Sequence, residues 1–355
     1  MSTLSANLAP ADAGGGFKAR SRMPVAVWLL ACCALVFAMV VVGGVTRLTH
    51  SGLSIVEWQP IVGAVPPLNE AQWLETFGRY QQTPEYQKVN HGMSLDAFKS
   101  IFWWEYFHRL LGRMIGVVFL LPLLWFWRRG HIDRPLALRL AGVFVLGGLQ
   151  GAMGWYMVKS GLVDDPRVSQ YRLTAHLSFA LAIYAAMLWT ALGLLYSGVK
   201  SADARQQRLR KFSWVITAMV AYMVMTGGFV AGTHAGLAYN TFPLMNGHIV
   251  PPEIFMLQPL HLNFFNNLAT VQFDHRLGAW LLAVLVPWFW LTARRAALSP
   301  RARLCVNLLP VMLALQITLG ISTLLLVVPV PLAAAHQAGA VLLLTAALLA
   351  NHSLR

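Results

Sequence analysis

The sequence predicts an all-α membrane protein with eight transmembrane helices, arranged as two four-helix bundles that are related by a pseudo-twofold axis. Three observations support this fold class. Of the 355 residues, 57% are hydrophobic and only 11% are charged, which is unusual for a soluble domain. The apolar residues form eight segments of about 20 residues, the length that spans a bilayer as a helix. The second half of the chain also repeats motifs of the first half.

The eight predicted spans cover residues 24–46, 106–127, 137–158, 173–196, 213–233, 272–292, 304–328 and 332–351. The first apolar run is too long for the core of a signal peptide and lacks a clear cleavage site, so we expect it to be retained. We expect residues 1–23 to be a disordered cytoplasmic tail. The first bundle then covers residues 24–200 and the second covers 201–355.

The net charge of +14 is explained by membrane topology. Lys and Arg residues precede the first span and fill the short connections after the second, fourth and sixth spans, all on one side. The positive-inside rule places these connections and both termini in the cytoplasm. The two long connections, about 47–105 and 234–271, then face the other side of the membrane, and the second contains no Lys or Arg. The basic residues therefore reflect the topology of a multi-pass membrane protein and not a surface that binds nucleic acid.

An internal repeat relates the two halves of the chain. Gly43-Gly44 and Thr49-His50-Ser51-Gly52-Leu53 recur 184 residues later as Gly227-Gly228 and Thr233-His234-Ala235-Gly236-Leu237. Further matches are His108-Arg109-Leu110 with His275-Arg276-Leu277, Leu149-Gln150 and Gly154 with Leu315-Gln316 and Gly320, and His176 with His336. Each repeat has four spans, so both halves enter the membrane from the same side, and their axis lies along the membrane normal.

Four histidines, His108, His176, His275 and His336, lie near the outer ends of predicted spans at matching places in the two halves. An ionisable group within a membrane span is costly and indicates a functional site. Two imidazoles from facing helices of one bundle suit a heme iron. Zinc is less favoured because cysteines and carboxylates to complete a tetrahedral shell are scarce nearby.

A di-iron carboxylate site is also less favoured. Glu105 and His108 have the Glu-x-x-His spacing of such sites, but Gln272 occupies the corresponding place before His275. We therefore interpret the Glu-x-x-His spacing in the first half as a coincidence.

Residues beside the four histidines allow two interpretations each. Arg109 and Arg276 either bind heme propionates or extend outward to the membrane surface. His50 and His234 either cap a heme from above or belong to the turns that begin the outer loops. The remaining histidines lack a repeat partner and are expected to be solvated: His91, His131, His248, His261 and His352.

One carboxylate distinguishes the halves. Glu57 lies in an apolar and aromatic stretch of the first outer loop, whereas Asn240 or Thr241 occupies the corresponding place in the second. If one half performs acid–base chemistry and the other carries electrons, the first half is the better candidate for the chemistry.

From Pro24 onward the chain resembles the heme A synthases of the proteobacterial and mitochondrial class. The resemblance rests on five motifs taken together: Gly43-Gly44-Val45-Thr46-Arg47-Leu48-Thr49, Glu57-Trp58-Gln59-Pro60-Ile61, Glu105-Tyr106-Phe107-His108-Arg109, Asn240-Thr241-Phe242-Pro243-Leu244-Met245 and Asp274-His275-Arg276.

The resemblance implies an oxidoreductase that oxidises the C8 methyl of heme O to a formyl by successive hydroxylation, giving heme A for cytochrome c oxidase. It implies that His275 and His336 ligate a heme b, that His108 and His176 contact the substrate heme O, and that Glu57 takes part in the oxidation. Heme O synthase and assembly factors of the oxidase would be its partners. Some relatives carry cysteine pairs in the outer loops, whereas Cys32, Cys33 and Cys305 lie in predicted spans, which argues against a thiol relay.

Two other functions fit part of the pattern. A diheme b-type cytochrome that takes electrons from quinol would explain the four histidines and the repeat, but not Glu57 or the motifs. A transporter of heme or a small solute would also show a repeat, but its site usually lies at the midplane with broken helices.

Overall fold

The computed structural model describes residues 14–57, 62–162, 166, 168–196 and 203–355. Eight helices in these ranges are long and apolar enough to cross a membrane. They are α1 (Gly14–Leu48), α4 (Leu95–Arg128), α5 (Arg134–Gly161), α6 (Gln170–Leu195), α7 (Ala204–Thr233), α9 (Leu268–Arg294), α10 (Pro300–Leu325) and α11 (Val330–Ser353). The prediction of an all-α protein with eight spans is confirmed.

The helices form two groups of four that lie side by side. We call α1, α4, α5 and α6 the first half, and α7, α9, α10 and α11 the second half. The halves meet through α1 against α11 and α6 against α7. In the repeat, α1 corresponds to α7 and α6 corresponds to α11. The contact of α1 with α11 is therefore equivalent to the contact of α7 with α6, as a twofold relation requires. One continuous apolar core runs through all eight helices.

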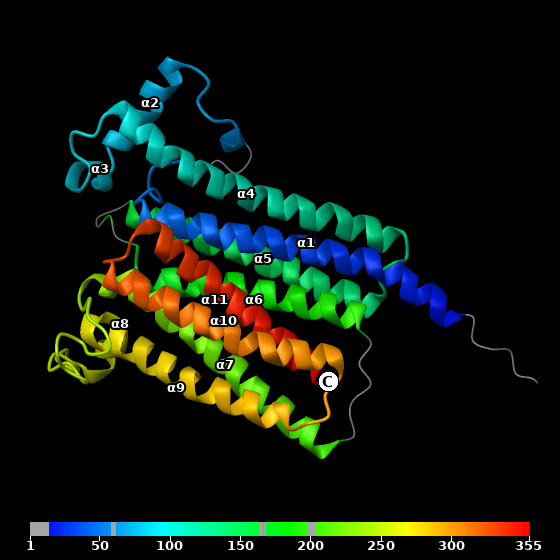
Figure 1. Ribbon diagram of the computed structural model, residues 1–355. Coiled ribbons are helices and arrows are strands. Elements are labelled where there is room, and N and C mark those ends of the chain that lie inside the picture. The colour runs from blue at the N-terminus through cyan, green and yellow to red at the C-terminus, as the bar shows by residue number, and fades with distance from the viewer. Residues whose placement is uncertain (1–13, 58–61, 163–165, 167, 197–202) are drawn as a thin grey trace, which may run out of the picture.

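The two ends of the molecule differ in character (Figure 1). The start of α1 and the C-terminus lie at the same end of the bundle. At the opposite end lie the two long connections, which contain the short helices α2 (Glu70–Gln81), α3 (Pro84–Lys88) and α8 (Asn263–Asn266). We call this the loop end.

Helix α1 begins earlier than expected. The tail was expected to extend to residue 23, but residues from Gly14 onward are helical; residues 1–13 lie outside the described part. Ala19, Arg20, Arg22 and Met23 are good helix formers. Pro24, which lies inside α1, is tolerated there.

In the first half, α4 and the connection before it form an outer cap. Helix α4 has 34 residues, more than a bilayer requires, and its first turns extend beyond the predicted span that starts at residue 106. Tyr80 of α2 packs there against Phe98, Phe102 and Tyr106 in a buried aromatic cluster. We call α2, α3 and these turns of α4 the cap.

The cap contains a buried acid, Glu85 of α3, which is only 5% exposed. Burial, and secondarily the nearby Glu105, raise the pKa of the Glu85 carboxyl to about 8. In the unfolded chain this carboxyl ionises near its ordinary value. Between about pH 4.5 and 8 the folded cap therefore holds a proton that the unfolded cap releases, and its stability falls as pH rises through this window.

We expect Glu85→Gln, which keeps the carboxyl's shape without its charge, to remove most of this pH dependence and to protect the cap at pH 8. Hydrogen exchange of α2 and α3, corrected for the intrinsic rate at each pH, measures the effect. Glu70→Gln, at an exposed glutamate of α2, is the matched control. Equal pH dependence in wild type and Glu85→Gln would contradict this role.

Candidate functional site

The structure brings the four histidines together as the two predicted pairs. His108 on α4 and His176 on α6 lie within electrostatic range of each other, and the imidazole rings of His275 on α9 and His336 on α11 are neighbours. His176 and His336 each lie six residues after the start of their helix (Gln170 and Val330). Both pairs therefore lie toward the loop end.

The second pair has a geometry that suits an iron between two imidazoles. The ring centroids of His275 and His336 are 6.5 Å apart and the rings are inclined at 84°. Two metal–nitrogen bonds of about 2 Å, with a ring on each side, require a centroid separation of about 6 Å. No three His, Cys, Asp or Glu side chains of the described residues gather into a metal-binding group. A heme iron needs no such group, because the porphyrin supplies its other ligands.

Each of the four imidazoles packs against a glycine of a neighbouring helix. A Cβ built on the glycine would lie 2.8 Å from Cε1 of His108 at Gly43, 3.1 Å from Cε1 of His176 at Gly154, 3.3 Å from Cε1 of His275 at Gly227 and 2.8 Å from Cε1 of His336 at Gly320. These contacts are too close for most side chains. The repeated glycines of the sequence therefore make room for the histidine rings.

The second glycine of each Gly-Gly pair serves the contact between halves. A Cβ on Gly44 would lie 2.3 Å from Oε1 of Gln337 on α11, and one on Gly228 would lie 2.8 Å from Oγ1 of Thr174 on α6. Small residues let membrane helices approach closely. Adjacent glycines thus accommodate a histidine of their own half on one side and a helix of the other half on the other side.

A repeated glutamine holds the second histidine of each pair. Gln150 Nε2 donates a hydrogen bond to the backbone carbonyl of His176, and Gln316 Nε2 donates one to that of His336, both at 3.0 Å. The halves then differ, because Gln150 Nε2 also lies 3.3 Å from His176 Nε2.

The halves differ most at the first histidine of each pair. Thr226 Oγ1 lies 2.8 Å from His275 Nδ1. The residue 184 positions earlier is Val42, which has no hydroxyl, and His108 Nδ1 is buried without a hydrogen-bond partner among the described residues. A hydrogen bond to one ring nitrogen sets the tautomer and orients the other nitrogen toward a metal. Of these two first histidines, His275 has this support and His108 does not, as far as the described residues show.

Arg109 and Arg276 bind the outer loops to the helices that carry the histidines. Nη2 of Arg109 donates to the carbonyl of Ile55, and Nη2 of Arg276 donates to the carbonyl of Tyr239, both at 2.7 Å. These two acceptors are 184 residues apart, so the repeat offset is preserved here. Glu57 therefore corresponds to Thr241, which decides between the two counterparts that the sequence allowed.

Glu105 completes the attachment of the first loop. Its Oε1 accepts hydrogen bonds from Arg109 Nε (3.0 Å) and Nη2 (2.5 Å). Its Oε2 accepts from Ser54 Oγ (2.7 Å) and Ile55 N (2.8 Å). Both oxygens are thus engaged by the protein, which explains the Glu-x-x-His spacing without a metal. In the second half Gln272 accepts from its arginine through Oε1 at 3.0 Å.

Glu57 lies at the edge of the cap. Its Oε1 accepts a 2.5 Å hydrogen bond from Arg79 Nη1 of α2, and its side chain is 46% exposed. Its backbone carbonyl accepts from Arg109 Nη1 at 3.0 Å, which ties it to the residue after His108. The rest of its motif, residues 58–61, lies outside the described part. Arg79 has no sequence signal that would have identified it.

His50 and His234 both adopt left-handed backbone conformations, with φ of 53° and 59°. His234 is the C-cap of α7, and both side chains are exposed. This geometry favours the interpretation that they belong to the turns after α1 and α7. The three cysteines are buried and free.

Comparison with known proteins identifies the family. A family model described as cytochrome oxidase assembly protein matches residues 26–348. Heme A synthase of Nitrosospira multiformis is 67% identical over 335 residues, which cover 94% of each chain. Heme A synthases of Nitrosomonas eutropha and Paramagnetospirillum magneticum are 57% and 52% identical, over 98% and 100% of this chain and 98% and 99% of theirs. The chain therefore belongs to the heme A synthase family of cytochrome oxidase assembly proteins.

Proposed function

We propose that the two halves divide the conversion of heme O to heme A between them. The second half holds a resident heme b, ligated by His275 and His336, and the first half binds the substrate heme O at His108 and His176. Glu57 acts at the C8 methyl as that methyl is oxidised to a formyl. The observation that carries this division is the hydrogen bond between His275 Nδ1 and Thr226 Oγ1, whose hydroxyl donates to the carbonyl of Met223, so that Nδ1 donates to Thr226. His108 Nδ1 has no such partner among the described residues.

A resident cofactor needs ligands that stay in place. The ring separation of 6.5 Å suits an iron, and the Thr226 hydrogen bond leaves His275 Nε2 as the ligand nitrogen. Nε of Arg276 is buried without a hydrogen-bond partner among the described residues, so it is placed to meet a heme propionate. When bound, heme b would supply one-electron transfer.

A substrate must instead enter and leave. His108 Nδ1 has no partner among the described residues, whereas its counterpart His275 has Thr226. His176 and His336 are alike in that Nδ1 of each lacks a partner there. The weaker support of His108 favours exchange of the bound heme. The cap, which the second half lacks, covers the loop end of α4.

Glu57 is the acid–base candidate because Arg79 and Arg109 fix it at the edge of the cap. Oxidising a methyl to a formyl releases protons, and a carboxylate can accept them. Arg109 is a positioning residue: it holds the loop of Glu57 against the helix of His108.

The remaining assignments follow from topology. We propose that the protein lies in the cell inner membrane with both termini in the cytoplasm, which places the histidines toward the periplasm. Heme O synthase and oxidase assembly factors are the expected partners.

The diheme cytochrome remains the second candidate, because the paired histidines and glycines occur in both halves. A pure electron carrier would leave added heme O unchanged, whereas this protein should convert it to heme A.

We expect His275→Ala and His336→Ala each to abolish the low-spin bis-imidazole spectrum of the purified protein, because each removes one axial ligand. Electron paramagnetic resonance of the oxidised protein measures this. An unchanged bis-imidazole signal in both variants would show that this pair does not ligate the cofactor.

Thr226→Val is a more specific test of the same site than the histidine variants. It keeps both imidazoles and introduces the valine that the first half has at the corresponding position, Val42. We expect about 10-fold weaker retention of heme b, the usual size of such an effect, together with a changed signal. Thr217→Val, which removes a hydroxyl bonded only within α7, is the control. Equal retention in both variants would remove Thr226 from the site.

We expect His108→Ala and His176→Ala to abolish heme A formation while most heme b stays bound, because they alter only the substrate pair. Pigment extraction followed by chromatography separates hemes b, O and A. Loss of heme b from these variants, with none lost from the second-half variants, would reverse the two roles.

We expect Glu57→Gln to lower heme A formation by about 100-fold, the lower end for loss of a general base, with heme O or a hydroxylated intermediate accumulating. The side chain keeps its shape, so heme b binding should be unchanged. Glu75→Gln, which also removes a carboxylate partner of Arg79, is the matched control. A normal heme A yield from Glu57→Gln would exclude Glu57 from the mechanism.

A further inference from the structure

A cluster of cations lies at the end of the second half that is opposite the histidine pairs. Arg210 on α7, Arg301 on α10 and Arg355 at the C-terminus all lie within electrostatic range of His352. His352 is only 3% exposed, and both of its ring nitrogens are buried without a hydrogen-bond partner among the described residues. The expectation that His352 is solvated is therefore wrong: the end of α11 packs His352 against Trp189 of α6.

The cluster has polar atoms without partners. Within the described part of the chain, Arg210 Nε, Arg301 Nη2 and both side-chain polar atoms of Asn351 are buried and make no hydrogen bond. The ion pairs recorded for the described residues do not include these arginines. Burial, and secondarily Arg210, lower the pKa of Arg355. Crowded, partly buried cations with unused donors indicate a site for an anion.

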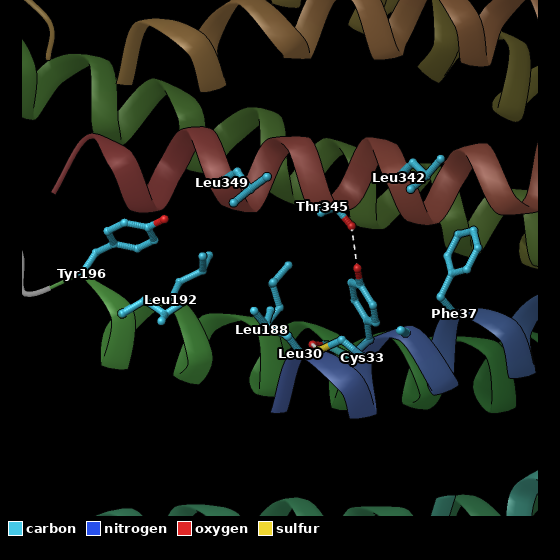
Figure 2. Close-up of a pocket in the computed structure, with 12 residues that line it drawn as sticks. Leu30, Cys33, Phe37, Leu188, Leu192, Tyr196, Leu342, Thr345 and Leu349 are labelled. Atoms are coloured by element: carbon cyan, nitrogen blue, oxygen red, sulfur yellow. Dashed lines mark hydrogen bonds between the residues drawn. The ribbon is translucent and has the colours of Figure 1, made fainter. Parts of the chain in front are cut away.

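An apolar groove of about 460 Å³ ends beside this cluster. Figure 2 shows it between α1, α6 and α11, with Phe37 near one end and Tyr196 near the other. Its lining is mostly aliphatic, and the hydroxyls of Tyr184 and Thr345 satisfy each other at 2.8 Å. The guanidinium carbon of Arg301 lies 3.1 Å from the centre of the ring of Tyr196, which lines the groove, so the groove ends at Arg301.

We propose that the groove and the arginine cluster together bind one anionic phospholipid, with an acyl chain along the groove and the phosphate at the arginines. The apolar lining lies along membrane-spanning segments, and the cations lie at their ends, at the level of lipid headgroups. A soluble anion would use the arginines but not the groove. The groove is lined by α1 and α6 of the first half and α11 of the second, so the lipid would join the two halves.

The probe is phosphatidylglycerol, compared with phosphatidylcholine of the same acyl chains. The purified full-length holoprotein is delipidated, mixed with each lipid in detergent and analysed by native mass spectrometry and thermal unfolding. We expect one phosphatidylglycerol to be retained and to raise the unfolding temperature, while phosphatidylcholine does neither. Equal retention of both lipids, or of neither, would overturn the proposal.

Two pairs of variants locate the site. Arg210→Gln with Arg301→Gln should weaken phosphatidylglycerol binding by about 10-fold, whereas Arg303→Gln, at an exposed arginine of α10, should not. Ala34→Phe, which fills the groove, should also weaken binding, whereas Ala31→Phe, exposed on α1 outside the groove, should not. Loss of binding only in the arginine variant would contradict the acyl-chain assignment.

In a last experiment, inorganic phosphate replaces the lipid, and the heme b spectrum confirms that every variant is folded. If phosphate raised the unfolding temperature as much as phosphatidylglycerol does, and by the same amount in Ala34→Phe, the site would bind an anion alone. That result would overturn the lipid proposal.

Discussion

Close packing of an imidazole ring against the backbone of a neighbouring helix is the constraint on which the rest of this structure depends. A histidine at a heme site must lie between helices, and any side chain opposite its ring would displace it. Gly43, Gly154, Gly227 and Gly320 remove that obstacle, one for each histidine. The same close approach draws the helices of each half together. The adjacent Gly44 and Gly228 then extend it to the contact between halves.

The repeat supplies two similar sites, and function arises where they differ. Thr226 supports His275, whereas Val42 leaves His108 without a partner in the described structure. The cap and Glu57 occur only in the first half. These differences are the basis of our proposal that the second half holds a resident cofactor and the first half an exchangeable substrate. A symmetric electron carrier would have no need of either difference.

Much of this arrangement could be predicted from sequence because it depends on long-range regularities. Apolar segment length determines the number of spans, and the offset of 184 residues aligns the histidines and glycines. The role of Arg109 could not be predicted, because its acceptors are backbone carbonyls that leave no sequence signal. Thr226 could not be identified from the repeat because its counterpart in the first half is Val42, so the hydroxyl does not recur. His352 was misjudged because three helices other than its own decide its burial.

The central claim is that the second half holds the resident heme and the first half the substrate. An experimental structure of the protein, purified without added heme O, tests it most directly. The account predicts heme density between His275 and His336, with Thr226 Oγ1 bonded to His275 Nδ1, and no heme at His108 and His176. Heme between His108 and His176, with the second pair empty, would contradict it.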